Sequence, residues 1–430
     1  MNNFLNFIGK SVSQYHATEE MANILKAEGF VEIFEENSNK LELGGKYFVT
    51  RNHSSIIAFC VPTTLDNLSV NITATHTDSP TFKLKPNNKL VLDGNYTSLN
   101  TEVYGGPIYS SFFDRPLSLA GRAFVKTNGQ IEERLVNVDR DLLVIPNECI
   151  HFNRDVNSGK NYNPQIDLLP LLGDETADLD KILRETLNLD EVDRILSHDL
   201  QIYNRFRGTI FGANKEYFMA PQIDNLESAY GTLMGFVKSN NNESFNVWAS
   251  FDNEEVGSHT KQGAGSRFLA DTLQRAFASI GLSNCALLRA LSTGLFVSCD
   301  NAHAVHPNDL GKTDRLNKVY MNKGIVIKYN ANQSYTTDAL SSALIKDIFD
   351  NSNVSYQEFT NRSDVRGGGT LGAISQGLVS MPSVDIGLPQ LAMHSACETA
   401  GVKDLDTLIK GMEAFYNTKI VKTGNNYKLN

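Results

Sequence analysis

Cysteine is scarce in this chain of 430 residues, and its placement excludes several architectures. There are five cysteines, an odd number, and no two of them form a CxxC motif. This usage argues against a disulfide framework and against a cysteine-based structural zinc site, and it predicts reduced thiols in a cytoplasmic protein. The five are Cys60, Cys149, Cys285, Cys299 and Cys397.

Long apolar runs and a basic surplus are also absent. No uninterrupted apolar stretch approaches the roughly 20 residues that span a bilayer, so no membrane association is expected. The first stretch, MNNFLNFIGKSVSQ, lacks the basic start, apolar region and small-residue cleavage site of a signal peptide. The net charge of −10 argues against nucleic-acid binding and against a basic membrane-surface protein.

What remains is the composition of an ordinary globular protein, with 41% hydrophobic and 20% charged residues. The length suggests two domains, one inserted into the other. We expect a catalytic domain made of residues 1–81 plus 211–430, interrupted by a β-rich domain of residues 82–210.

Short β-branched stretches and helical patterns alternate in the outer parts of the chain. SSIIAFCV, LSVNITAT, FNVWASF, ALLRALSTGLFVSCD and GIVIKYN read as strands. NLESAYGTLMGFVK, GSRFLADTLQRAFASI and TDALSSALIKDIF read as helices, as does EEMANILKAEG with Thr18 as its cap. The alternation predicts an α/β fold in which a mixed sheet is sandwiched by helices.

The expected insertion, residues 82–210, has fewer long helical patterns than the outer parts of the chain. Asn128-Gly129 separates two alternating runs and predicts a β-hairpin. The only long helical pattern there is TADLDKILRETLNLDEVDRILSHDL.

Metal-ligand residue types follow the expected strands. In open α/β sheets, sites gather beyond the carboxyl ends of the strands, so these residues are expected to converge. They are His76 and Asp78 in ITATHTDSP, Asp224 in APQIDNL, Glu254 and Glu255 in SFDNEEVGS, Asp300 in FVSCDNAHAVHP, and His394 in SVDIGLPQLAMHS.

Each of these residues alone has a structural explanation. Asp224 could cap a helix, the two adjacent glutamates could form a solvated loop, and a histidine at a strand end can simply be hydrogen-bonded. Taken together, two His, two Asp and one Glu match a pair of divalent ions with mixed imidazole and carboxylate ligands. Two dications would also remove the repulsion between Glu254 and Glu255.

The stretches THTDSP, YGGPIYSSFFDRPLSLAGR, IDNLESAY, FDNEEVGS, DNAHAVHP and DIGLPQLAMHS occur in an order that resembles the aspartyl aminopeptidase family. Its members are dinuclear zinc exopeptidases with a β-rich insertion, and the resemblance spans almost the whole chain. It implies removal of N-terminal Asp or Glu from peptides.

The resemblance also implies roles for the individual residues. His76 and Asp300 would hold one metal ion, Glu255 and His394 the other, and Asp224 would bridge them. Glu254 would be the general base that takes a proton from the attacking water. Asp78 would orient His76.

Substrate contacts and assembly follow from the same resemblance. Lys328 would pair with the acidic side chain of the substrate, and His306, with His303 beside it, would lie on the substrate side. His151 in the insertion would reach the active site of a neighbouring subunit. Dimers would then assemble into a tetrahedral dodecamer.

Several alternatives remain open from the residues. A carboxypeptidase or an amide deacylase on the same fold would use the same ligands and base. A peptide-binding or scaffold protein without turnover would have no use for Glu254. The metal can be zinc, manganese or cobalt, because sites of His and carboxylate accept all three.

Overall fold

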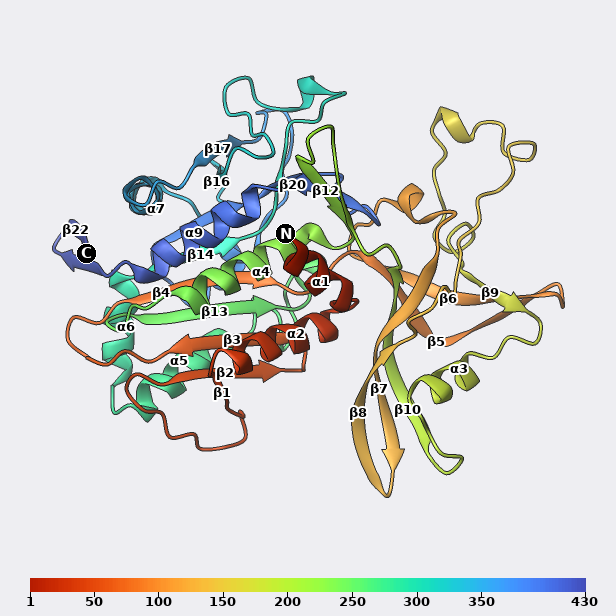
Figure 1. The fold of residues 1–430 in the computed structure, drawn as a ribbon, viewed down its shortest axis with the longest axis horizontal. Helices are drawn as coiled ribbons and strands as arrows, with labels where there is room; N and C mark the ends of the chain where they lie inside the picture. Colours follow the sequence, from red (N-terminus) through yellow and green to blue (C-terminus); the bar gives the residue numbers. More distant parts are fainter.

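The computed structural model describes residues 1–430 and is built around a sheet of nine strands (Figure 1). Four strands at its centre are parallel and every one of their residues is buried. The outer strands add antiparallel pairings on both sides, so the sheet is mixed. In spatial order the strands are β1 (Val31–Glu32), β2 (Lys46–Arg51), β3 (Ser55–Cys60), β13 (Phe245–Phe251), β4 (Val70–His76), β14 (Leu295–Cys299), β18 (Ser383–Gly387), β16 (Ile325–Tyr329) and β17 (Tyr356–Thr360).

Helices cover both faces of this sheet, which confirms the predicted sandwich (Figure 1). One face is covered by α1 (Asn2–Lys10), α2 (Gln14–Ala27), α4 (Ile223–Lys238), α7 (Ala339–Asn351) and α9 (Asp404–Asn417). The other is covered by α5 (Phe268–Ser279), α6 (Asn284–Thr293) and α8 (Leu371–Ser375).

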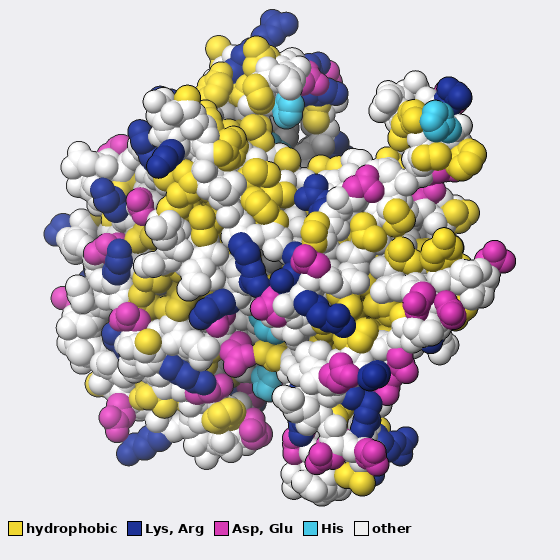
Figure 2. Space-filling model, turned by 45° about the vertical axis from the view of Figure 1, so that its right-hand side comes forward, with side chains coloured by type: hydrophobic (Ala, Val, Ile, Leu, Met, Phe, Trp, Pro, Cys, Tyr) yellow, Lys and Arg dark blue, Asp and Glu magenta, His cyan; other side chains and the backbone are white.

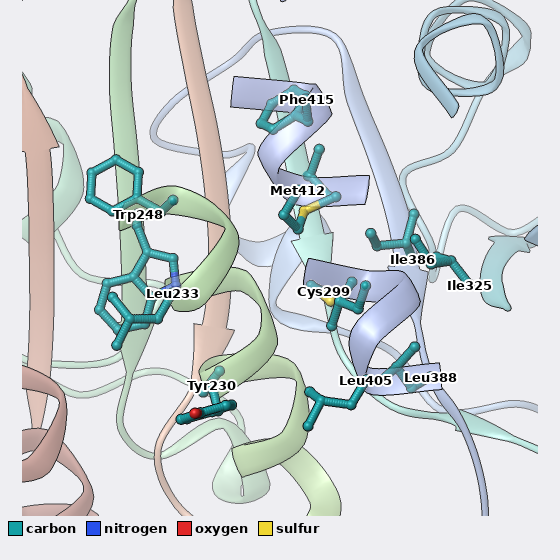
Figure 3. Close-up of a cluster of buried hydrophobic side chains, with 14 of the residues drawn as sticks. Tyr230, Leu233, Trp248, Cys299, Ile325, Ile386, Leu388, Leu405, Met412 and Phe415 are labelled. Carbon is teal, nitrogen blue, oxygen red and sulfur yellow. The ribbon is translucent and has the colours of Figure 1, made fainter. Parts of the chain in front are cut away.

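The first of these two layers forms the larger apolar core. Figure 3 shows Tyr230 and Leu233 of α4 beside Leu405 and Met412 of α9, against side chains of the sheet such as Trp248. Burial of such side chains removes apolar surface from water and stabilises the fold by about 25 cal/mol per Å². The helix expected for residues 225–238 is therefore confirmed, and its apolar side chains lie in this core.

The start of α2 differs from the expectation. Thr18 is buried within the helix, and the N-cap is Ser13, whose hydroxyl accepts the backbone N–H of His16. The helix begins one turn earlier than expected because Ser13 satisfies an N–H that would otherwise lack a partner.

The stretch 286–300, expected as one strand, is a helix followed by a strand. Helix α6 is capped by Ser283, buries Leu287, Ala290 and Leu291 at helical spacing, and is followed by Gly294. A Cβ at Gly294 would lie 1.7 Å from the carbonyl oxygen of Val70, so only glycine allows the chain to enter the sheet here. Apolar residues are frequent in both the helix and the strand, so the sequence shows no clear change from the helical to the strand period.

A second, antiparallel sheet is formed by residues of the expected insertion and lies beside the main sheet (Figure 1). It encloses its own apolar core. Asn128 and Gly129 both have positive φ and turn the chain between two of its strands, which confirms the hairpin. The long helical pattern forms only the short helix α3 (Leu179–Thr186); a turn follows, and the end of the pattern lies in a strand that begins at Arg194. The strands are β8 (Gln130–Asn137), β7 (Leu117–Thr127), β10 (Arg194–Asn204), β5 (Thr81–Leu92), β6 (Tyr96–Tyr104) and β9 (Leu171–Asp174).

A third sheet of five short strands joins the chain before Asp224 to the chain around His394, through pairing of β12 with β20. Its strands are β11 (Thr209–Phe211), β12 (Tyr217–Ala220), β20 (Glu398–Gly401), β19 (Pro389–Leu391) and β15 (Ala302–His303). The remaining elements are the hairpin β21 (Ile420–Thr423) and β22 (Asn426–Leu429), and the short 3-10 helices η1 (Tyr109–Phe112), η2 (Val156–Ser158), η3 (Glu254–Val256) and η4 (Leu310–Lys312).

None of the helices combines the length and the apolar character that crossing a bilayer requires. All five cysteines are free. On the face shown in Figure 2, Lys and Arg side chains are interspersed with Asp and Glu, and no continuous basic surface is visible.

Candidate functional site

The parallel strands end at one edge of the main sheet and deliver the expected residues there. His76 is the last residue of β4, and Asp300 follows β14 directly. Glu254 and Glu255 lie in η3, which begins three residues after the end of β13. The convergence follows from the topology, because neighbouring parallel strands present their carboxyl ends side by side.

Asp224 and His394 come from outside the main sheet. Asp224 lies at the start of α4, where its backbone departs from helical angles and its peptide bond to Asn225 is cis. His394 follows β19 with a left-handed backbone conformation (φ 68°). The third sheet brings both residues to the strand ends. In it β12, which precedes Asp224, pairs with β20, which follows His394.

The five side chains form two groups that share Asp224. In the first, Nε2 of His76 lies 3.5 Å from Oδ1 of Asp224 and 3.5 Å from Oδ1 of Asp300. In the second, Nε2 of His394 lies 3.5 Å from Oδ2 of Asp224 and 3.5 Å from Oε2 of Glu255. The two oxygens of one carboxylate thus face two different histidines.

These separations fit metal coordination better than hydrogen bonding. A good N–H···O bond measures about 2.9 Å, whereas two ligand atoms bound tetrahedrally to zinc at about 2.0–2.1 Å lie about 3.4 Å apart. Oδ1 of Asp224 and Oε1 of Glu255 are buried and have no hydrogen-bond partner. Buried carboxylate oxygens without partners are costly. The donor set therefore fits divalent metal binding.

Asp78 connects His76 to the two glutamates. Nδ1 of His76 lies 3.1 Å from the backbone oxygen of Asp78 and 3.5 Å from its Oδ1. The same carboxylate accepts the backbone N–H groups of Glu254 and Glu255 at 3.1 and 3.2 Å. Burial would raise the pKa of Asp78, but His76 and these donors hold it below its usual value. The carboxylate of Asp78 is therefore ionised, and it holds His76 and the backbone of Glu254 and Glu255 in place.

Glu398 and Gly106 hold the other half of the cluster, and the sequence analysis missed both. One oxygen of Glu398 accepts the backbone N–H of Asp224 at 2.9 Å, and the other accepts that of His394 at 2.7 Å. The carbonyl oxygen of Gly106 lies 3.1 Å from Nδ1 of His394 and leaves Nε2 free to face the cluster. Glu398 lies only four residues after His394, but Asp224 and Gly106 are far from their partners in the sequence, so no local motif signals the whole arrangement.

Glu254 lies within the cluster but outside the two groups described above. Burial, then the nearby carboxylates of Asp300, Asp78 and Asp224, raise its pKa to about 8, against a lowering effect of His76. Bound dications would favour the ionised form and lower this pKa again. A carboxyl group in such surroundings can take up and release a proton near neutral pH.

Lys328 is buried beside the cluster. Its Nζ donates to the backbone oxygen of Asn301 at 2.9 Å and lies 5.5 Å from the centre of the Tyr335 ring. Burial would lower its pKa, but Asp300, Tyr335 and Asp385 raise it above the usual value. The lysine is therefore a buried cation and not a surface side chain that reaches solvent.

The three histidines expected on the substrate side lie in different surroundings. The His303 side chain is exposed within one chain, but it lies close to the cluster: partial loss of hydration and then Lys328 lower its pKa, against the effect of Asp224 and Asp300. His306 is exposed, and its Nδ1 accepts the backbone N–H of Asn308 at 3.2 Å. His151 is exposed in the excursion between β8 and β9, and no hydrogen bond or ion pair joins it to the cluster within one chain.

Comparison with known proteins gives concordant matches over nearly the whole chain. The family model described as "Aminopeptidase I zinc metalloprotease (M18)" matches residues 7–416. A Clostridium acetobutylicum protein named "Probable M18 family aminopeptidase 2" is 44% identical over 422 residues, 96% of this chain and 97% of its own length.

Two solved structures illustrate the match of the fold. A chain in the cryo-EM structure of the Ape4 and Nbr1 complex superposes with a TM-score of 0.91 at 34% identity, covering 96% of this chain and 85% of that one. The S. cerevisiae mApe1 dodecamer superposes with a TM-score of 0.84 at 23% identity, covering 96% and 95%. The family match, the identity and the shared fold agree: this chain belongs to the M18 family of aminopeptidases, which are zinc metalloproteases.

Proposed function

We propose that this aminopeptidase removes N-terminal Asp or Glu from peptides with the help of two divalent metal ions, zinc by preference, with manganese or cobalt as substitutes. The observation that carries the proposal is the shared carboxylate of Asp224, which offers one oxygen to each of two groups of ligands. His76 and Asp300 would hold one ion, and Glu255 and His394 the other.

When bound, the pair of ions supplies an activated water and polarises the carbonyl group of the scissile peptide bond. Glu254 takes the proton of that water and delivers it to the leaving amine. Asp78 keeps Glu254 and Glu255 in place through their backbone N–H groups. The two neighbours thereby serve different purposes, one in proton transfer and one in ligation.

Preference for an acidic residue rests on Lys328. Three ligand carboxylates and the carboxylate of Glu254 nearly balance two dications, so the cluster offers little net charge to an acidic side chain. The ammonium group of Lys328 uses one of its three donors on Asn301. Its remaining donors can bind a substrate carboxylate close to Asp300.

A panel of aminoacyl p-nitroanilides with Asp, Glu, Ala and Leu, tested after addition of zinc, manganese or cobalt to metal-free protein, checks the proposal. We expect Asp and Glu substrates to be cleaved fastest. Lys328→Met keeps the aliphatic chain but removes the charge, so kcat/KM should fall about 10- to 100-fold more for acidic than for neutral substrates. Lys323→Met, at an exposed position before β16, is the control and should leave the ratio unchanged.

Three results would contradict parts of this proposal. An equal loss of kcat/KM on acidic and neutral substrates would show that Lys328 does not determine the preference for acidic residues. Cleavage of C-terminal residues or of acylated amines, with free N-termini left intact, would favour the carboxypeptidase or deacylase alternative. Metal binding without any turnover would favour a peptide-binding protein.

We also propose that residues 82–210 form an assembly domain through which copies of this chain join as dimers and then as a tetrahedral dodecamer. The excursion that carries His151 also exposes large apolar side chains, with Phe152 82% exposed and Ile166 70% exposed. An mApe1 structure of the same fold is a dodecamer. In such an assembly, His151 of the partner subunit would contribute to the substrate site.

Sedimentation velocity of the purified chain tests this assembly. We expect one large species, which Phe152→Glu should split into smaller ones because a buried charge in an apolar contact is costly. Leu316→Glu is the matched control, because Leu316 is similarly exposed (91%) but lies outside residues 82–210. A monomeric wild-type chain would contradict the proposal.

A further inference from the structure

The segment that leaves the second sheet at the end of β6 touches four parts of the candidate site. Tyr104 contacts Asp78 and Asn253, and Gly105 lies against Glu255, so that a Cβ there would come within 3.1 Å of the Glu255 Cβ. Gly106 contacts the His394 ring, and the backbone N–H of Ile108 donates to the carbonyl oxygen of His394 at 2.9 Å. The edge of the second sheet is thus one wall of the cluster.

Within this wall, the hydroxyl of Tyr104 makes two hydrogen bonds. It donates to Oδ2 of Asp78 at 2.6 Å and accepts from Nδ2 of Asn253 at 2.8 Å. The side chain is 7% exposed, and Nζ of Lys83 lies 4.0 Å from the centre of its ring. Tyr104 also pairs across the sheet with Thr81, three residues after Asp78. Its position is therefore determined by the sheet and not by the loops that it contacts.

Both partners of the hydroxyl control the turn that carries the two glutamates. Asn253 immediately precedes Glu254 and adopts the left-handed conformation (φ 64°) that starts η3. Asp78 accepts the backbone N–H groups of Glu254 and Glu255. One phenol thus connects the side chain before the turn to the carboxylate that holds the turn from below.

We propose that Tyr104 is a positioning residue that fixes the turn of Glu254 and Glu255 against the sheet and so couples the second sheet to metal ligation and proton transfer. The roles of the two glutamates rest on the proposed function. Tyr104 is neither one of the proposed metal ligands nor the proposed base; it acts on them through Asp78 and Asn253. Without the hydroxyl, Asn253 loses an acceptor and Asp78 loses a donor, so the turn can sample orientations in which Glu255 does not face His394.

Tyr104→Phe tests the inference, because it removes the hydroxyl and keeps the ring and its contact with Lys83. We expect kcat to fall about 10-fold with KM within about twofold, because the loss affects the reacting groups and not substrate binding. The zinc dissociation constant, measured by competition with a chromogenic chelator, should rise about 10-fold, as is usual when a partner of metal ligands is lost. The visible absorption bands of the cobalt-loaded protein should also change in intensity.

Tyr203→Phe is the matched control. Tyr203 is equally buried in the same sheet, and its hydroxyl also makes two hydrogen bonds, to Asn137 and from Arg205. It should lower the unfolding midpoint as much as Tyr104→Phe does, yet leave zinc affinity, the cobalt bands and kcat within about twofold of wild type. If the two variants give the same zinc affinity and the same kcat, the positioning role is wrong. The zinc and cobalt measurements do not depend on turnover. They therefore test the positioning role of Tyr104 even if the wild type cleaves no N-terminal residue.

Discussion

Replacement of Glu254 by glutamine is expected to lower kcat by roughly 10²- to 10⁴-fold, the usual contribution of a general base. The amide has nearly the same shape but cannot accept the proton of the attacking water. Zinc content should remain that of the wild type, because Glu254 stands outside the two groups that share Asp224. Steady-state kinetics and elemental analysis of the same preparation measure both quantities.

Glu255→Gln is the matched comparison, since it makes the same chemical change one residue away. Oε2 of Glu255 lies 3.5 Å from Nε2 of His394, so this variant should lose zinc together with activity. The difference between the two neighbours is the decisive result. Wild-type turnover by Glu254→Gln would remove this residue from the role of base, and loss of zinc would make it a ligand instead.

Replacement of Asp224 by alanine is expected to have the largest effect on metal content. Its two carboxylate oxygens face His76 and His394 separately, so one substitution removes a ligand from both groups. Zinc per chain should fall by more than half after dialysis against a mild chelator, and turnover should fall with it. Loss of a shared anionic ligand weakens both sites, because each group then lacks one of its carboxylate oxygens.

His394→Ala serves as the reference for Asp224→Ala. It removes a ligand from one group only, so it should release about one zinc ion while the other stays bound. Circular dichroism is needed in parallel, because the N–H of Asp224 donates to buried Glu398 and the substitution changes the charge beside it. A folded Asp224→Ala protein with normal zinc stoichiometry would contradict the bridging role.

Sequence reasoning worked best where a residue's place depends on the order of strands. His76, Glu255 and Asp300 follow three adjacent parallel strands, and such strands must bring their carboxyl ends together. Asp224 and His394 were located by their residue types and by the family resemblance. Their approach depends on the pairing of β12 with β20, and no local pattern predicts that pairing.

Reasoning from local pattern failed where two structures share the same composition. Residues 286–293 contain apolar side chains that suit a strand or a helix. In the structure they are helical, and the hydroxyl of Ser283 caps the helix. Thr18 and Ser13 are both acceptable caps, but Ser13 accepts the N–H of His16 and Thr18 is buried inside the helix. Such choices are made by burial and by satisfied backbone N–H groups, which a single stretch of sequence does not reveal.

By itself, the sequence determined the alternation of strands and helices, the kinds of metal ligand available, and the edge of the sheet at which they gather. The apolar period and the chemistry of each side chain are local properties, so they can be read from the chain. Only the tertiary structure decided which groups support the ligands: Asp78 under the glutamates, Glu398 under Asp224, and Tyr104 from the second sheet. These supports are hydrogen bonds, many of them to backbone N–H groups far away in the chain, and such bonds exist only once the two sheets have packed together.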